Sequence, residues 1–235
     1  MVVLLTVALG AGGCATSRTP NGPTVEQPPT PPAAAAPTGT PTGTPTAAPT
    51  PSGRPTAPPS SAKPKPRYVF PVRAGNVSYH PTHSAYPGTD IFANCGAPVV
   101  AVTDGKVLEV SRVDRYRKSG PQGPDNGGRS VAILGADGVR YYGSHLTEVA
   151  AGLAAGVRVR AGQQVGTVGR TGNANNVCHL HFGISPPCEQ TGDWWIRRGV
   201  VWPAEFLDAW RRNVNRSPAG EVRDWHRKRG CPPAP

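Results

Sequence analysis

The sequence predicts a mainly β protein: a small antiparallel β-sandwich or barrel-like domain with short C-terminal helices, preceded by a disordered tether. Two observations support this fold class. Short apolar stretches alternate with glycine-containing turns between residues 97 and 184, a pattern typical of all-β sandwiches and barrels. Residues 15–66 hold 16 of the 29 prolines and no aromatic residue, so they lack the apolar surface that offsets the entropy lost on folding.

The expected strands are short apolar stretches separated by tight turns. Four stretches carry the strand pattern: residues 97–110, 129–146, 156–172 and 179–184. In the first two, Asp104-Gly105 and Asp137-Gly138 supply tight turns between paired strands. The polar stretch 112–128 separates these two pairs, and loops of that length often form the rim of a functional site.

Two short helices are expected at the C-terminal end. Pro203 stands near the start of the first, whose apolar residues recur at helical spacing as far as Trp210. Ser217 and Pro218 suit the N-cap and first residue of the second, which reaches Trp225. The tryptophans of this region are interpreted as core anchors.

The N-terminal residues carry an export signal. Residues 1–13 are apolar, too short to cross a bilayer as a helix, and fit the core of a secretory signal. The residues up to Cys14 resemble a bacterial lipobox, in which the cysteine is lipidated; an ordinary cleaved signal peptide is the alternative. We therefore divide the chain into a signal peptide (1–13), a lipidated Cys14 with its Pro/Thr-rich linker (14–67), a β domain (68–188) and a helical extension packed on that domain (189–235).

The charge balance narrows the possible partners. A formal net charge of +11 favours an anionic partner, with simple solubility as the alternative. The export signal argues against nucleic acid, so anionic wall polymers or lipid headgroups fit better. The lipid on Cys14 is the expected contact with the membrane.

Four cysteines follow Cys14, and an even number outside the cytosol predicts two disulfides. Three pairings are possible. We favour Cys95 with Cys178, which would tie an early loop to the last strand. Cys188 with Cys231 would then hold the C-terminal segment on the domain. Free buried thiols or zinc ligands are the alternative.

The last strand, within CHLHFGI, carries two histidines. Because side chains alternate between the faces of a strand, His179 and His181 share one face while Leu180 and Phe182 share the other. Such a pair is either two half-buried structural histidines or one side of a metal site.

Other metal-ligand candidates occur in a distinctive order. His80 and His83 precede Asp90, His145 stands alone later, and the His-x-His pair comes last. Together with the phrases APVVAVTDGKV and VRAGQQVGTVGRTGN, this order resembles the lysostaphin-like, LytM-type zinc endopeptidases over about residues 83–185. The resemblance implies their small β-sheet scaffold, called the duplicated hybrid motif, with catalytic Zn²⁺ and peptidoglycan peptides as substrates.

The resemblance also implies individual roles. Asp90 and His181 match two zinc ligands, which with a third leave one coordination position open for water. His145 and His179 match the two catalytic histidines that the family holds beside that water. The set as a whole favours a metal site over structural histidines.

The first zinc ligand departs from the family pattern. The family's HxxxD motif places a histidine four residues before the aspartate, where this chain has Tyr86. His83 lies seven residues before Asp90, and the intervening Tyr-Pro-Gly turn has room to loop out the extra residues. We assign His83 as the first ligand, with His80 and Tyr86 as the alternatives.

The expected function is a monomeric, exported and membrane-anchored cell-wall hydrolase that cleaves stem peptides or crosslinks of peptidoglycan. A catalytically degenerate LytM-type module that regulates other wall hydrolases is the main alternative. A lipoyl-type carrier is a weaker one, because the glycine-rich hairpin within 156–172 lacks a modifiable lysine at its turn. The segment Gly172–Asn176, just before the last strand, is either a plain turn or part of a cleft lining that offers backbone and amide hydrogen bonds; we favour the turn.

Overall fold

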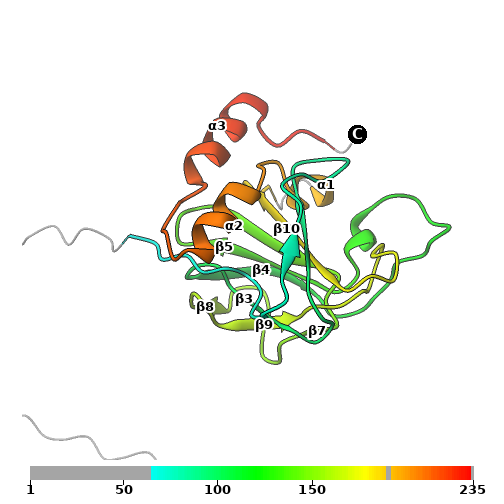
Figure 1. Cartoon of the computed structure of the whole chain (residues 1–235). Coiled ribbons are helices and arrows are strands. Elements are labelled where there is room, and N and C mark those ends of the chain that lie inside the picture. The colour runs from blue at the N-terminus through cyan, green and yellow to red at the C-terminus, as the bar shows by residue number, and fades with distance from the viewer. Residues whose placement is uncertain (1–64, 189–191, 234–235) are drawn as a thin grey trace, which may run out of the picture. The chain divides into compact units, whose positions relative to one another are not determined.

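The computed structural model describes residues 65–188 and 192–233 (Figure 1). The expected signal segment, Cys14 and the tether as far as residue 64 lie outside the described residues. Ten strands form two antiparallel sheets. The larger sheet has the order β1-β2-β10-β6-β5-β4-β8 and the smaller β3-β9-β7. The strands are β1 (Ser78–Tyr79), β2 (Thr89–Phe92), β3 (Pro98–Val100), β4 (Gly105–Ser111), β5 (Ser130–Gly135), β6 (Arg140–Ser144), β7 (Glu148–Val149), β8 (Arg158–Val159), β9 (Gln164–Thr167) and β10 (His179–Ser185).

The mainly β, antiparallel fold class is confirmed. Each of the four stretches with the strand pattern forms strands, and β5 and β6 form the expected hairpin. The pairing expected across Asp104-Gly105 is wrong, because β3 pairs with β9 in the smaller sheet while β4 pairs with β5 and β8 in the larger one. The expected turn at Asp137-Gly138 is present, with Gly138 at a φ of 80° that favours glycine. Strand β2 was not predicted, because four residues are too few to show a period.

One apolar core lies between the two sheets. Val99 of β3 and Val165 of β9 belong to the same buried cluster as Val131 of β5 and Leu180 of β10. On β10 the residues Leu180, Phe182 and Ile184 enter this core, so the histidines on the opposite face are left for the other side of the large sheet.

Three helices follow the strands: α1 (Trp194–Arg197), α2 (Ala204–Arg211) and α3 (Ala219–Arg229). Helix α2 packs its apolar side against the core through Trp210, whose ring stacks 5.4 Å from that of Tyr68. The second expected helix begins one residue later than predicted, at Ala219. Trp202 contradicts the expectation of a core anchor, since it is 42% exposed. Within the described ranges, no helix is long and apolar enough to cross a membrane.

Both favoured disulfides are present in the structure. Cys95 is bonded to Cys178, which precedes β10, and Cys188 is bonded to Cys231, which follows α3. The first bond joins the loop after β2 to the start of β10. The second joins the segment after β10 to the C-terminal end of the described chain. Both therefore brace the strands that carry the histidines.

Strand register places the site. In the antiparallel pair β2–β10, His181 lies directly opposite Asp90, and in the pair β10–β6 it lies opposite Ser144. Side chains directly opposite each other point to the same face about 5 Å apart. Three adjacent strands thus bring Asp90, His181 and the residue preceding His145 into one row across the sheet.

Candidate metal centre

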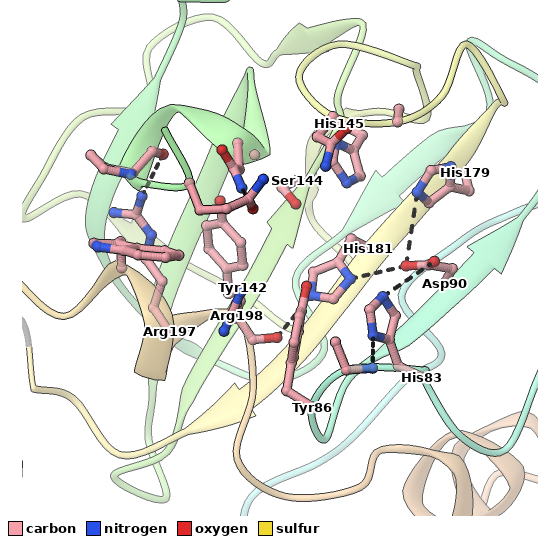
Figure 2. A pocket seen from close by; sticks show the side chains of 18 of the residues that line it. His83, Tyr86, Asp90, Tyr142, Ser144, His145, His179, His181, Arg197 and Arg198 are labelled. Carbon is pink, nitrogen blue, oxygen red and sulfur yellow. Dashed lines mark hydrogen bonds and ion pairs between the residues drawn. The ribbon is translucent and has the colours of Figure 1, made fainter. Parts of the chain in front are cut away.

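Three side chains converge at the centre of this row. Ligand atoms of His83, Asp90 and His181 all lie within 4.8 Å of one another. One carboxylate oxygen of Asp90 lies 2.9 Å from Nδ1 of His181, and the other lies 3.7 Å from Nε2 of His83 (Figure 2). His83 comes from the irregular segment between β1 and β2, which folds back over the sheet. Two imidazoles and one carboxylate are the donor types that a catalytic zinc uses.

The protonation of His181 is determined by its other nitrogen. Nε2 lies 2.8 Å from the carbonyl oxygen of Arg198, which accepts only, so Nε2 must carry a hydrogen and donate it. Nδ1 then presents its lone pair to Asp90. Two facing lone pairs repel unless a proton or a cation lies between them. A histidine whose far nitrogen donates to a backbone carbonyl is the usual arrangement of a metal ligand, so this pair fits a bound ion.

His83 fits an ion less completely. Its Nδ1 lies 3.3 Å from the backbone N–H of Ala85 and accepts its hydrogen, which places the ring hydrogen on Nε2. A metal bound through Nε2 requires the hydrogen on Nδ1, facing the Ala85 N–H. Binding through His83 therefore needs a small movement of residues 83–85, whose exposed positions 84 and 85 leave room for one.

Two further histidines stand beside the donor group. Nδ1 of His145 donates to the carbonyl of Thr171 at 2.8 Å, and Nδ1 of His179 donates to the carbonyl of Val177 at 2.9 Å. Each ring therefore has its unprotonated nitrogen at Nε2. That of His179 lies 3.8 Å from Asp90, and the His145 and His179 rings are 4.7 Å apart. Both nitrogens are suited to accept a proton or a hydrogen bond.

His145 adopts a left-handed backbone conformation, with φ of 66°. Non-glycine residues rarely adopt it, and it often marks a functional site. The conformation follows directly after the last residue of β6 and turns the imidazole toward His179. Hydrogen bonds from the backbone N–H of His145 to Gly127 and from Thr171 to the carbonyl of His145 hold it there.

Burial and mutual charge shift the acidities of the site. Burial raises the pKa of Asp90, but the close contact with Nδ1 of His181 and the charges of the three neighbouring histidines outweigh this and lower it to about 2. Burial lowers the pKa of His145 to about 3, helped by the charges of His181 and His179. Burial also lowers the pKa of His83, against the opposing charge of Asp90. Asp90 is thus an anion and His145 is uncharged near neutral pH.

The donor group lies at the bottom of an open cleft of about 380 Å³. One wall is formed by the long loop 112–128, whose short 3₁₀ helix spans Pro124–Gly127. The segment 172–176 forms part of the same wall and corrects our interpretation of it as a plain turn, because Asn173, Ala174 and Asn175 line the cleft. The two segments are held together by a hydrogen bond from Tyr116 to the side chain of Asn173.

A further part of the cleft lining was missed from the sequence. It consists of Tyr86 and the segment beginning with α1, of which Trp194, Arg197 and Arg198 line the cleft. Helix α1 has four residues and no visible period, so no pattern marked it. We expected residues 189–235 to pack on the domain as an extension; the described part of that stretch also builds the cleft. The available signal was a pair of tryptophans and a pair of arginines on either side of Ile196.

The structure brings together most of the expected site residues. His83, Asp90 and His181 share the donor group, and His145 and His179 flank it. His80, an alternative first ligand, instead contacts the ring of Phe92 and lies outside the group. The other alternative, Tyr86, packs its ring 4.5 Å from that of His83 and 5.6 Å from that of His181, also outside the group.

Comparison with known proteins relates most of this domain to a peptidase family. The model of peptidase family M23 matches residues 84–192, beginning one residue after His83. Glycyl-glycine endopeptidase ALE-1 of Staphylococcus capitis is 35% identical over 96 residues, which cover 40% of this chain and 23% of that protein. L-Ala–D-Glu endopeptidase of Bacillus subtilis is 30% identical over 133 residues, which cover 54% of this chain and 36% of that protein.

A solved structure is also similar. The crystallised catalytic domain of lysostaphin from Staphylococcus simulans is 25% identical, with a TM-score of 0.41 over 61% of this chain and 92% of that one. The chain spans about a quarter to a third of the length of the two curated relatives. On the family match and the shared sequence, residues 84–192 form a domain of peptidase family M23.

Proposed function

We propose that this chain is a zinc-dependent endopeptidase that hydrolyses peptide bonds in the stem peptides or crosslinks of peptidoglycan. The observation that carries the proposal is the group of His83, Asp90 and His181 at the bottom of an open cleft, flanked by two further imidazoles. Membership of peptidase family M23 and two relatives named as endopeptidases support it.

In this proposal His83, Asp90 and His181 hold Zn²⁺. When bound, the ion lowers the pKa of a coordinated water and polarises the carbonyl of the scissile bond. His179 takes the proton of the attacking water on Nε2 and returns it to the leaving amine, since its Nδ1 hydrogen stays on the Val177 carbonyl. His145 stays uncharged and accepts a hydrogen bond on Nε2, which orients the water.

We further infer that the protein works outside the cytoplasm as a monomer, anchored through lipid on Cys14 and reaching the wall on its proline-rich tether. Two disulfides in the described domain support an oxidising compartment. The net charge of +11 suits a wall rich in anionic polymers.

A second function has one specific observation in its favour. His83 lies outside the family match, and its present hydrogen bond with Ala85 places its hydrogen on the nitrogen that faces Asp90. A chain that keeps this arrangement binds zinc weakly. Such a chain would act as a wall-binding module that regulates other hydrolases rather than as an enzyme.

The test is hydrolysis of purified peptidoglycan and of synthetic stem and crosslink peptides by the purified chain, with new termini identified by mass spectrometry. We expect cleavage that a chelator abolishes and zinc restores. We also expect His145→Ala and His179→Ala to lose at least about 100-fold in rate, the usual contribution of a general acid–base group. His80→Ala is the matched control, because it removes a nearby histidine that lies outside the donor group.

Two outcomes would decide against the proposal. A zinc-loaded chain that cleaves none of these substrates is not the endopeptidase. If that same chain accelerates peptidoglycan cleavage by a separate wall hydrolase, the regulatory function replaces it.

A further inference from the structure

Arg198 has an unusual position in the part of the cleft wall formed by Tyr86 and α1. It follows α1, and its guanidinium carbon lies 3.9 Å from the centre of the Tyr86 ring (Figure 2). The same carbon lies 5.1 Å from the centre of the Trp194 ring. Contact of a guanidinium with aromatic rings at these distances is attractive and restricts the side chain to one plane. Both rings line the cleft together with Arg198.

The charge of Arg198 is unpaired within residues 65–188 and 192–233. Its neighbour Arg197, also in the cleft wall, forms an ion pair with Glu109 at 2.7 Å and donates to the carbonyl of Pro124. Arg198 forms no ion pair there, and its buried Nε has no hydrogen-bond acceptor. Leaving a buried donor without an acceptor is unfavourable. The guanidinium is therefore held by its contacts with the two aromatic rings, and its charge has no partner in the described residues.

The position of Arg198 relative to the donor group is defined by its own backbone. Its carbonyl oxygen receives the Nε2 hydrogen of His181. One peptide residue spans about 3.5 Å, so a peptide with its scissile bond at the donor group places an adjacent side chain within reach of this wall.

We propose that Arg198, held between Tyr86 and Trp194, is a carboxylate-binding residue that selects peptides with an acidic residue beside the scissile bond. This inference rests on the proposed endopeptidase function and names the substrate class within it. Guanidinium N–H groups form a planar fork that matches the two oxygens of a carboxylate, and such charge-assisted bonds are roughly twice as strong as neutral ones. A peptide made only of glycine offers this wall no side-chain partner.

The test uses two peptides that differ in one group, a glutamate or a glutamine beside the scissile bond, together with a glycine peptide. We expect the purified zinc-loaded chain to favour the glutamate peptide over the glutamine peptide about 10- to 100-fold in kcat/KM, the range for hydrogen bonds to charged groups. Arg198→Gln should remove this preference. Arg198→Lys, which keeps the charge without the fork, should restore part of it. Arg223→Gln, which removes an exposed arginine from α3, is the charge-matched control and should keep the full preference.

Calorimetric titration of the same peptides into the His145→Ala chain separates this inference from the proposed function. A lower Kd for the glutamate peptide, lost on adding Arg198→Gln, supports carboxylate binding even if the wild-type chain cleaves no peptide. Cleavage of the glutamate and glutamine peptides at equal rates would leave the endopeptidase function intact and overturn the role of Arg198. A preference for the glutamate peptide that persists in Arg198→Gln would also overturn the role of Arg198.

Discussion

Arg140 and Asp193 form a buried ion pair that joins the large sheet to the cleft wall. Their side chains are 1% and 5% exposed, and the guanidinium lies 2.6 Å from the carboxylate. Arg140 begins β6 and also donates through Nε to Ser185 at the end of β10. Asp193 immediately precedes α1, so this pair holds the segment that presents Arg197 and Arg198 to the cleft.

Breaking this pair should destabilise the fold. Arg140→Met leaves a carboxylate buried without its partner, which typically costs about 3–5 kcal/mol. We expect a loss of that size in the free energy of unfolding measured by urea titration with both disulfides intact. Replacing both residues, as in Arg140→Met with Asp193→Leu, should recover most of the loss, because no charge then remains buried.

The exposed pair Arg216–Glu205 is the matched control, with side chains 47% and 68% exposed. Arg216→Gln should change the free energy of unfolding by no more than about 1 kcal/mol, since exposed ion pairs contribute little. Equal effects of the Arg140 and Arg216 substitutions would show that the buried pair does not anchor α1.

Zinc content should separate the ligands from the flanking histidines. We expect about one zinc per chain by elemental analysis, as the donor group offers one catalytic site of three protein ligands. His83→Ala and His181→Ala should lose the zinc, whereas His145→Ala, His179→Ala and the control His80→Ala should retain it. Loss in His181→Ala but not in His83→Ala would mean that His83 does not hold the first position.

Zinc should also change the hydrogen bonding of His83. In the zinc-free chain the hydrogen is on Nε2 and the N–H of Ala85 donates to Nδ1. Zinc bound through Nε2 moves the hydrogen to Nδ1, so the Ala85 amide loses its acceptor. Nitrogen-15 NMR during a zinc titration should show this change in the His83 ring and the Ala85 amide, while Nδ1 of His145 stays protonated. An Ala85 amide that is unchanged at full zinc occupancy would contradict binding through His83.

Gly88 should be intolerant of a side chain. A Cβ at this position would lie 2.8 Å from Cε1 of His181, closer than real Cβ contacts, and 3.3 Å from the carbonyl oxygen of Arg198. Gly88→Ala must therefore displace the ligand or the carbonyl that orients it. Loss of such orientation lowers metal affinity about 10- to 100-fold. Competition with a zinc chelator measures this, and Gly75→Ala, whose Cβ would meet nothing within 4 Å, should bind zinc normally.

Short-range patterns in the sequence predicted one part of the fold and of the site. Strand alternation placed His179 and His181 on one face, and the glycine turn at Asp137 marked the hairpin of β5 and β6. The same signal at Asp104 was misleading, because β3 and β4 lie in different sheets. The pairing of Asp90 with His181 needed the family resemblance, because strand register between residues 91 positions apart has no local signal.

The rest of the site depends on tertiary placement. His83 lies in an irregular segment, so its reach to Asp90 could not be derived from a period, and His80 and Tyr86 stayed open as alternatives. Arg198 enters the cleft because a buried ion pair at Asp193 positions α1 and because glycines allow close packing. Side chains at Gly183 or Gly199 would overlap the backbone of Arg198 or of Pro87 respectively. No periodic pattern in the sequence reports such contacts.

Strongly alkaline solution should unfold the domain through a buried tyrosine pair. Tyr141 and Tyr68 both donate to the same oxygen of Asp137, at 2.6 and 2.7 Å. Burial raises the pKa of both phenols, and the negative charge of Asp137 raises each further. The folded chain therefore keeps these protons at a pH where the unfolded chain, with phenol pKa values of about 10, releases them. The stabilisation is complete below about pH 10 and is lost as the pH rises above it.

The free energy of unfolding of the wild-type chain should accordingly fall as the pH rises above about 10. Tyr68→Phe removes one of the two phenols while keeping the ring that stacks on Trp210. Its stability should be lower near neutral pH, because a hydrogen bond to a charged group is lost, but it should decline less steeply with pH. Urea titrations at a series of pH values would measure both slopes. Parallel curves for the two proteins would contradict the prediction, since they would mean that Tyr68 releases its proton at the same pH in the folded and unfolded chains.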